Sequence, residues 1–400
     1  MELPAIEGGK PTRKEYLIFG KPQIGQEEID EVIKVLKSGW IGTGPKVQEF
    51  EANYRKYIGS KYAVAVNSCT AALHLSLLCS GIGEGDEVIT TPMTFGSTVN
   101  VIEHVRAKPV FVDIEEDSYN IDAEKIEAAI TPRTKAIIPV HFGGLACNMD
   151  RIYDLAKKNN LLVIEDAAHA IGAEYRSNKI GSFGNPTCFS FYPTKNITTI
   201  EGGMVCLNNE ELAEKIRIYS LHGQSKHAWQ RYGSSEKRIY EFIYPGYKCN
   251  MPDVNAALGI IQLKKIEEFL LKRCKYANIY LKELNDCNLI ELPPVKGNRR
   301  HAWHLFSFLL KIDKLRISRI QFMQAMHKEN IGTGVHYVAL HQQSYYKNKY
   351  KFKDGMFKRA EYVSDRTISV PLQTSMSEGD IYDVIKATKK VLNYYKKNNS

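Results

Sequence analysis

The sequence has no long hydrophobic run. No apolar stretch approaches the roughly 20 residues that a helix needs to cross a bilayer, and the N-terminal segment MELPAIEGGKPTRKEY lacks the basic and then apolar regions of a signal peptide. The eight cysteines are scattered, with no CxxC pair. We therefore expect a cytoplasmic protein with reduced thiols, no membrane association and no disulfide framework.

Blocks of like charge are absent as well. The 54 Lys and Arg residues outnumber the 45 Asp and Glu residues and give a net charge of +9, but no run of bases is long enough to form a nucleic-acid-binding arm. This modest excess favours an anionic small-molecule substrate and argues against a nucleic acid partner. The 400 residues, 44% of them hydrophobic, can bury a large core in two or three domains.

Short apolar runs alternate with helical patterns over most of the chain. The runs are apolar on consecutive residues, which is typical of strands covered on both faces of a parallel sheet. We expect strands at 62–66, 87–90, 109–114, 135–140, 161–166, 187–192 and 202–207, and helices at 26–39, 70–81, 123–130 and 149–160. This pattern predicts an α/β domain with a mostly parallel sheet, in which a ligand binds beyond the carboxyl ends of the strands.

A second, smaller domain follows. The helical stretch 253–285 links it to the sheet domain, and the remainder combines a strand pattern at 304–312 with a helical one at 379–395. We place a large α/β domain at 18–265 and a small α+β domain at 266–400.

Two ionisable residues stand out in the large domain. Asp166 ends an apolar run, where a carboxylate is costly to desolvate, and it is either a helix N-cap or a counter-ion for a ligand cation. Lys195 follows the strand pattern TCFSFY and precedes a Gly-Gly pair. A lone loop lysine is usually solvated, but a desolvated one has a lowered pKa and an amine that can form an imine.

Three further features complete a pattern. Segment 67–75, NSCTAALHL, turns from a strand into a helix, and the N–H groups of a helix start can bind a phosphate. Ser190, on the strand before Lys195, is a second phosphate ligand or an ordinary strand residue, and Phe95 is a stacking ring or a core residue. A lysine, an acid, a phosphate site and an aromatic ring are together what pyridoxal phosphate needs.

The segments NSCTAAL, TPMTF, PVHFGG, VIEDAAHAIGA, FSFYPTKNITTIEGG and GYKCNMPDVNAALGIIQL, in this order, resemble the nucleotide-sugar aminotransferases of the DegT type over about residues 18 to 390. The resemblance implies the type I fold of aspartate aminotransferase, with a mostly parallel seven-stranded sheet and a smaller C-terminal domain. It implies that Lys195 carries the cofactor pyridoxal 5′-phosphate and moves protons, and that Asp166 pairs with the pyridine nitrogen. The other cofactor-binding residues that it implies are His169 near the phenolic oxygen, and Thr70, Ala71 and Ser190 on the phosphate.

The resemblance also implies a homodimer with shared active sites, because Asn250 corresponds to a residue that reaches the cofactor phosphate of the neighbouring subunit. The segments HAWHLF (301–306) and IGTGVHY (331–337) look most similar to enzymes that aminate C4″ of a UDP-linked 4-keto pentose. They suggest His336 and Tyr337 as substrate-binding residues, together with Trp40 at the site entrance.

The expected reaction moves an amino group from L-glutamate, with release of 2-oxoglutarate, to the keto carbon of a nucleotide-diphosphate keto sugar. C4 is the expected carbon, and the product serves a cell-surface polysaccharide or glycoconjugate. The alternatives are amination at C3, a sugar dehydratase, whose members carry histidine at the position of Lys195, and a regulatory protein without turnover.

Two other patterns carry no function. The segment GWIGTG lacks the GxGxxG order and a preceding strand, so it predicts no dinucleotide site. A zinc site built from His301, His304, His336 and His341 would lack cysteine partners, so we expect no metal. The chain departs from its apparent family at Cys69 and Ile200, which both stand where glycine is usual.

Overall fold

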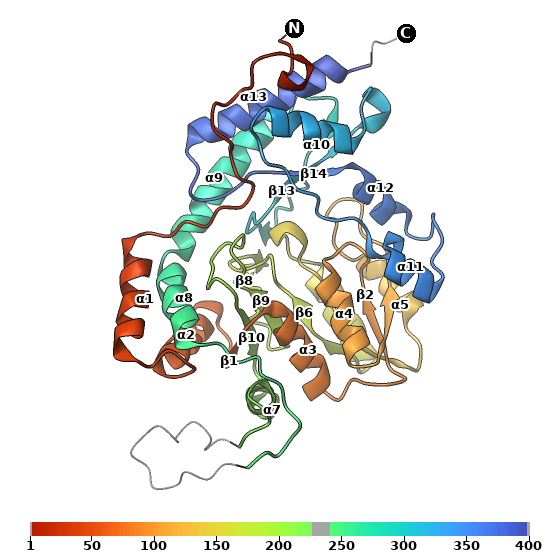
Figure 1. The fold of residues 1–400 in the computed structure, drawn as a ribbon. Coiled ribbons are helices and arrows are strands. Elements are labelled where there is room, and N and C mark those ends of the chain that lie inside the picture. The colour runs from red at the N-terminus through yellow and green to blue at the C-terminus, as the bar shows by residue number, and fades with distance from the viewer. Residues whose placement is uncertain (1, 226–240, 398–400) are drawn as a thin grey trace.

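The computed structural model describes residues 2–225 and 241–397 of the chain (Figure 1). The strands of the large sheet within these ranges are β1 (Tyr62–Val66), β2 (Glu87–Thr90), β3 (Lys108–Phe111), β4 (Thr134–Ile137), β5 (Leu162–Val163), β6 (Glu165–Asp166), β9 (Thr187–Ser190) and β10 (Gly203–Leu207). They form two sheets of order β3-β2-β4-β5 and β1-β10-β9-β6. Ile164 alone separates β5 from β6, and the N–H of Asp166 donates to Pro139, just beyond β4, so the two sheets continue into each other.

The sheet is mostly parallel, as predicted. β3, β2, β4 and β5 are parallel neighbours, and so are β6 and β9. β10 is antiparallel to both of its neighbours, β9 and β1. With β5 and β6 taken as the one interrupted strand predicted at 161–166, the described residues contain the expected seven strands. The carboxyl ends of β1, β2, β6 and β9 therefore meet at one edge of the sheet.

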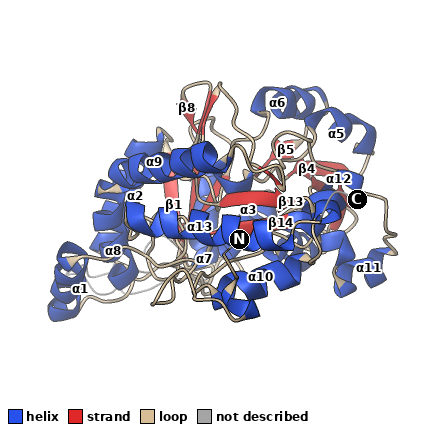
Figure 2. Cartoon of the chain, turned by 90° about the horizontal axis from the view of Figure 1, so that it is seen from above, coloured by secondary structure: helices blue, strands red, loops and turns tan. Residues whose placement is uncertain are grey.

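Helices cover both faces of this sheet (Figure 2). They are α1 (Gln26–Ser38), α2 (Pro45–Ile58), α3 (Cys69–Cys79), α4 (Gly96–His104), α5 (Ala123–Ala129), α6 (Met149–Lys158), α7 (Glu210–Ser220), α8 (Asp253–Lys264) and α9 (Ile266–Leu284). Along β1, Ala63 and Ala65 belong to a core cluster with α2, α5 and α6, whereas Val64 and Val66 belong to another with α3 and α7. Both faces of the strand are thus buried, which explains why its residues are apolar without alternation.

The C-terminal part has a core of its own. The strands β11 (Ile290–Glu291), β13 (Phe306–Leu310) and β14 (Thr367–Val370) form an antiparallel sheet, with α10 (Arg319–Lys328), α11 (Ser344–Tyr350), α12 (Lys358–Arg366) and α13 (Glu378–Tyr395). A second small sheet joins β12 (Arg299–Arg300), β7 (Glu174–Tyr175) and β8 (Asn178–Lys179). Helix α9 contributes to both large cores, through Phe269 to the first and Tyr280 to the second. The domain boundary at residue 265 remains a prediction.

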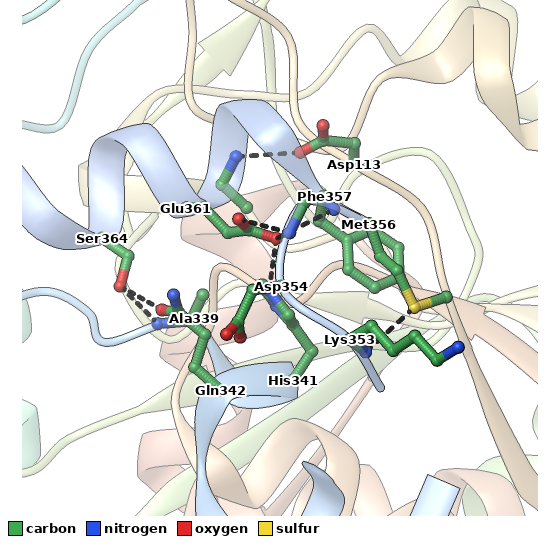
Figure 3. A network of polar contacts seen from close by, with 12 residues as sticks. Asp113, Ala339, His341, Gln342, Lys353, Asp354, Met356, Phe357, Glu361 and Ser364 are labelled. Carbon is green, nitrogen blue, oxygen red and sulfur yellow. Dashed lines mark hydrogen bonds and ion pairs between the residues drawn. The ribbon is translucent and has the colours of Figure 1, made fainter. Parts of the chain in front are cut away.

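A polar network ties the two parts together (Figure 3). Asp113, which follows β3, accepts hydrogen bonds from the backbone N–H groups of Arg359 (3.1 Å) and Ala360 (2.9 Å) at the start of α12. Glu361, in the same helix, accepts from the N–H of Gly355 at 2.8 Å and pairs with the buried His341 at 3.1 Å. A carboxylate beside the large sheet therefore caps a helix of the C-terminal part.

Helix α1 presents its apolar side to the surface. It ends as predicted at Gly39, which has a left-handed φ of 74°. Ile29, Ile33 and Leu36 are 46%, 39% and 53% exposed, although they form the apolar stripe of the helix. The buried side instead carries Glu28, whose carboxylate accepts from Lys265 of the α8–α9 junction at 2.9 Å. None of the helices in the described ranges is long and apolar enough to cross a membrane.

Candidate active site

A cavity of about 440 Å³ lies at the edge where the strands' carboxyl ends meet. Eight of the predicted residues line it, namely Thr70, Phe95, Asp166, His169, Ser190, Lys195, His336 and Tyr337. Ser68, Cys69, Thr94 and His304 line it as well. The chain thus brings the predicted amine, carboxylate, helix start and aromatic ring to one place from segments far apart in the sequence.

Lys195 lies in a turn that follows β9. Its N–H donates to the carbonyl of Tyr192 at 2.9 Å, and the amide of Asn196 donates to the carbonyl of Ala302 at 2.8 Å, which anchors the loop to the C-terminal part. Desolvation lowers the pKa of the Lys195 amine from 10.5 to about 8. The electrostatic attraction of Cys69 and Asp166 acts in the opposite direction and raises this pKa. The unprotonated form, which a nucleophile requires, is therefore far more populated near neutral pH than in an ordinary lysine.

Asp166 is a buried carboxylate at the end of β6, only 4% exposed. Its Oδ2 accepts from the Thr98 hydroxyl at 2.7 Å, and its Oδ1 accepts from the N–H of Ala168 at 3.1 Å. The chain continues from Asp166 in turns and not in a helix, which rules out the N-cap alternative. Burial raises the Asp166 pKa, while the bonds from Thr98 and Ala168 lower it.

The start of α3 forms another wall of the cavity. Ser68 is the N-cap, and its hydroxyl accepts from the N–H of Ala71 at 3.1 Å. Gly203 of β10 lies so close to this turn that a Cβ atom would be 2.4 Å from the carbonyl carbon of Ser68. Thr70 lines the cavity, but Ala71 does not. The predicted use of the Ala71 N–H for a phosphate is thus at odds with its bond to Ser68.

His169 and Tyr337 meet across the cavity. The N–H of Gly143 donates to His169 Nδ1 at 3.2 Å, and Nε2 lies 3.0 Å from the Tyr337 hydroxyl. Burial and the Lys195 charge hold the pKa of His169 well below its usual range, so the ring is neutral. Since Nδ1 accepts, the proton is on Nε2 and is donated to Tyr337. The single N–H of the His169 ring is therefore already hydrogen-bonded within the protein.

Two more histidines flank His169. The ring of His304 lies 4.5 Å from that of His169, and its Nδ1 is buried with no partner among the described residues. His336 has Nδ1 2.8 Å from the hydroxyl of Ser369. Burial lowers the pKa of His336 to about 4 and that of His304 well below 6.5, so both rings are neutral. Neutral imidazoles offer hydrogen bonds to a ligand without adding charge.

His304 is a cavity residue that the sequence did not reveal as such. It entered only through the zinc hypothesis, and the pairing HAWH was its one signal. The other members of that hypothesis are dispersed, because His301 stacks on Trp303 at 3.9 Å and His341 pairs with Glu361. No group of three or more metal-binding side chains occurs in the residues that the structure describes.

Phe95 sits at the cavity and is 63% exposed, an unusual degree for a phenylalanine. It occupies the N-cap position of α4, just beyond β2, and its ring centroid lies 6.1 Å from that of Tyr337. An exposed ring held by a helix start beside a cavity offers its face to a flat ligand.

The sequence profile of the DegT/DnrJ/EryC1/StrS aminotransferase family matches residues 22–389. The chain belongs to this family. It is 52% identical over 380 residues to the uncharacterized protein MJ1066 of Methanocaldococcus jannaschii, covering 95% of this chain and 98% of that one. It is 48% identical over 381 residues to the spore coat polysaccharide biosynthesis protein SpsC of Bacillus subtilis, covering 95% and 98%.

A solved structure of the putative sugar aminotransferase Spr1654 from Streptococcus pneumoniae is similar throughout. Its PLP form has a TM-score of 0.88 at 33% identity and covers 95% of this chain and 99% of that one. The same protein was also solved in a PMP form, with a TM-score of 0.87. The predicted family and the type I fold are thus confirmed, and the protein is a sugar aminotransferase.

Two residues predicted from the family lie elsewhere. Trp40 and Asn250 line a second cavity, of about 820 Å³, and not the cavity of Lys195 in their own chain. The Asn250 amide donates to the Thr43 hydroxyl, and its oxygen accepts from the Lys248 ammonium at 2.5 Å. Trp40, expected at the entrance of the site, thus does not line the Lys195 cavity of its own chain, whereas Asn250 is expected only at the cofactor of a neighbouring subunit.

The residues around Lys195 fit pyridoxal phosphate. The amine can bind an aldehyde, the buried carboxylate can face a ring nitrogen, and the exposed face of Phe95 can cover the ring. Because Gly203 has no side chain, β10 packs closely against the helix start of α3, where backbone N–H groups favour an anion. Ser190, at the end of β9, adds a hydroxyl on the same wall.

Proposed function

We propose that the protein is a pyridoxal-phosphate-dependent aminotransferase of the cytoplasm that transfers an amino group from L-glutamate to a nucleotide-linked keto sugar. The observation that carries the proposal is the meeting of Lys195, with its lowered pKa, and the buried Asp166 in one cavity. Spr1654, a putative sugar aminotransferase, was solved in both forms of the cofactor, which supports the same chemistry here.

When bound, the cofactor supplies an electron sink for the carbon next to the substrate nitrogen. The chain's own residues do the rest of the work in this proposal. Asp166 keeps a proton on the ring nitrogen, and Phe95 covers one ring face. Thr70 and Ser190 orient the phosphate with the start of α3. The Lys195 amine binds the aldehyde first and later carries a proton between carbons as general acid and base.

The nucleotide-linked keto sugar is proposed as the acceptor, with C4 as the aminated carbon. SpsC, a spore coat polysaccharide biosynthesis protein, is 48% identical, which supports a role in a cell-surface polysaccharide or glycoconjugate. The neutral rings of His304 and His336 offer hydrogen bonds to sugar hydroxyls without repelling or binding a carboxylate. The net charge of +9 helps to attract a diphosphate.

A homodimer with shared sites is part of the proposal. The exposed apolar stripe of α1, formed by Ile29, Ile33 and Leu36, suits a second copy of the chain. Ser38, the last residue of α1, lines the same cavity as Trp40 and Asn250. Because these two residues lie outside the Lys195 cavity of their own chain, a second copy offers the simplest way to use them.

Reconstitution and amino-group transfer test the function. The protein with pyridoxal phosphate should show a visible absorption band that borohydride fixes onto Lys195, and L-glutamate should bleach it with release of 2-oxoglutarate. A panel of UDP-, dTDP- and GDP-linked 3-keto and 4-keto sugars should then restore the band, and the position of the new C–N bond follows from NMR of the product. Protein that takes up no cofactor contradicts the proposal, and cofactor uptake without bleaching by any amino acid favours a regulatory protein.

A further inference from the structure

Two threonines connect Asp166 to the cavity wall. Thr98, fully buried in α4, donates its hydroxyl proton to Asp166 Oδ2 at 2.7 Å. Its oxygen lies 2.8 Å from the hydroxyl of Thr94, which lines the cavity just before α4. The three side chains form a continuous row of hydrogen bonds from the cavity to the carboxylate.

The direction of donation along these hydrogen bonds follows from the carboxylate of Asp166 at their inner end. An ionised carboxylate only accepts, so the single proton of Thr98 points to Asp166 and that of Thr94 must point to Thr98. Each hydroxyl then polarises the next one, which strengthens the bond to the charged oxygen. The other oxygen, Oδ1, is held by the N–H of Ala168 at 3.1 Å. Both oxygens of Asp166 are therefore fixed in position.

The row opposes the effect of burial. Asp166 is 4% exposed, and burial alone favours its protonated form, which could not balance a positively charged ring nitrogen. Hydrogen bonds to the ionised form shift this balance back, and the bond from Thr98 is the foremost of them. The ionisation of the carboxylate thus depends on a residue that does not itself line the cavity.

We propose that Thr98, supported by Thr94, is a positioning residue that holds Asp166 ionised and oriented, so that Asp166 keeps the ring nitrogen of pyridoxal phosphate protonated. This inference rests on the proposed function and goes beyond it. A buried threonine that only satisfies its own hydroxyl is the simpler account, and Thr90 provides the comparison. Thr90 is equally buried, but its hydroxyl donates to the backbone carbonyl of Ile138 at 2.8 Å.

The experiment reads the ring nitrogen directly. Holoenzyme is prepared with pyridoxal phosphate that carries ¹⁵N in the ring, and the NMR shift of this nitrogen reports its protonation. Asp166→Asn gives the reference for the unprotonated state. Thr98→Val should move the signal toward that reference and slow the half-reaction with glutamate about tenfold to hundredfold, the range for a hydrogen bond to a charged group. Thr98→Ser should restore the wild-type signal, and Thr90→Val should leave it unchanged.

Each result has one meaning. A protonated ring nitrogen in Thr98→Val, or an equal shift in Thr90→Val, contradicts the role of Thr98. If Thr98→Val does not fold, Thr94→Val removes only the outer hydrogen bond and should give a smaller shift in the same direction, and no shift counts against the proposal. Wild-type protein that binds no pyridoxal phosphate contradicts the proposed function itself, and with it this role, before any variant is made.

Discussion

The hydroxyl of Tyr337 accepts the Nε2 proton of His169 at 3.0 Å and so links the C-terminal part of the chain to the edge of the large sheet. The bond has a fixed direction because Gly143 already donates to Nδ1 of the same ring. The phenolic proton of Tyr337 is then left to a ligand in the cavity. The predicted contact between His169 and the phenolic oxygen of the cofactor remains a prediction, and Tyr337 lines the same cavity.

Tyr337→Phe leaves the buried N–H of His169 without its acceptor, so we expect a loss of about 1–3 kcal/mol in the free energy of unfolding. Urea denaturation measures this loss. Combining the variant with His169→Ala in a double-mutant cycle should give a coupling above about 0.5 kcal/mol. Strictly additive losses would show that the two side chains do not depend on each other.

The Lys195 amine should titrate well below an ordinary lysine. Only the unprotonated amine attacks an aldehyde, so the rate at which the apoprotein captures pyridoxal phosphate should rise with pH and level off above about 8, not near 10.5. The Asp166 carboxylate raises this pKa, and Asp166→Asn should move the midpoint to lower pH. Borohydride trapping followed by mass spectrometry measures the rate, and a midpoint near 10.5 would contradict the desolvation argument.

Lys195→Ala removes the nucleophile but not the rest of the site. We expect this variant to bind pyridoxal phosphate without a covalent bond, through Asp166 and the start of α3, and to lose at least about 100-fold in turnover. Equilibrium dialysis and steady-state kinetics separate the two effects. Turnover close to wild type would rule out the proton-transfer role.

Glu165 precedes Asp166 in β6 and points to the opposite face of the sheet, where it has a structural role. Its fully buried carboxylate accepts from His141 Nε2 (2.9 Å), the Tyr153 hydroxyl (2.7 Å) and the Thr187 hydroxyl (3.2 Å). Glu165→Gln turns an acceptor into a donor among these donors, so we expect the free energy of unfolding to fall by about 2–3 kcal/mol. Glu174→Gln, at a partly exposed carboxylate, should cost far less in the same urea titration.

Ile200, one of the two departures from the family pattern, has a backbone conformation that favours glycine. It has a left-handed φ of 70°, where glycine is favoured, and its side chain is 54% exposed. The Asn255 amide holds the turn by donating to the carbonyls of Thr199 (2.7 Å) and Glu201 (2.8 Å). Ile200→Gly should therefore raise the free energy of unfolding by up to about 1 kcal/mol, once the greater freedom of unfolded glycine is subtracted. A lower melting temperature for this variant would argue against strain in the turn.

If the apolar stripe of α1 forms the contact between two copies of the chain, a charge introduced into it should weaken the dimer. Leu36→Asp should weaken association of the chain, since it places a carboxylate in an apolar contact. Light scattering during size exclusion should show a smaller particle at low concentration. Leu271, 67% exposed on α9, offers a matched control. Equal masses for wild type, Leu36→Asp and Leu271→Asp would remove the support for a dimer through α1.

The strands, and the residues that line the Lys195 cavity, could be predicted from the sequence because both leave a local pattern. β1 and β2 have the predicted bounds, since each is an apolar run closed by polar residues. The run 161–166 is interrupted at Ile164, where neighbours switch from β4 to β9, and no local signal marks that switch.

Contacts between distant side chains could not be predicted in the same way. Thr98 and Asp166 are 68 residues apart, and nothing in either segment indicates that a hydroxyl of one meets a carboxylate of the other. Ser68 illustrates a choice that pattern leaves open, because a serine before a helix suits a cap and a phosphate site equally. The Ser68 hydroxyl caps the helix by accepting from the N–H of Ala71, while Thr70 lines the cavity, so the two roles fall to different residues of one turn.

Cys69, the other departure from the family pattern, bears on which nucleophile reacts. Burial raises the pKa of its thiol, which contacts the carbonyl of Cys188 at 3.4 Å, while the same loss of water lowers the pKa of Lys195. A thiol gains charge when it becomes reactive, whereas an ammonium loses it, so desolvation makes the thiol less reactive and the amine more reactive. For an aldehyde that enters the cavity, these opposite shifts favour condensation with the amine of Lys195 over attack by the thiol of Cys69.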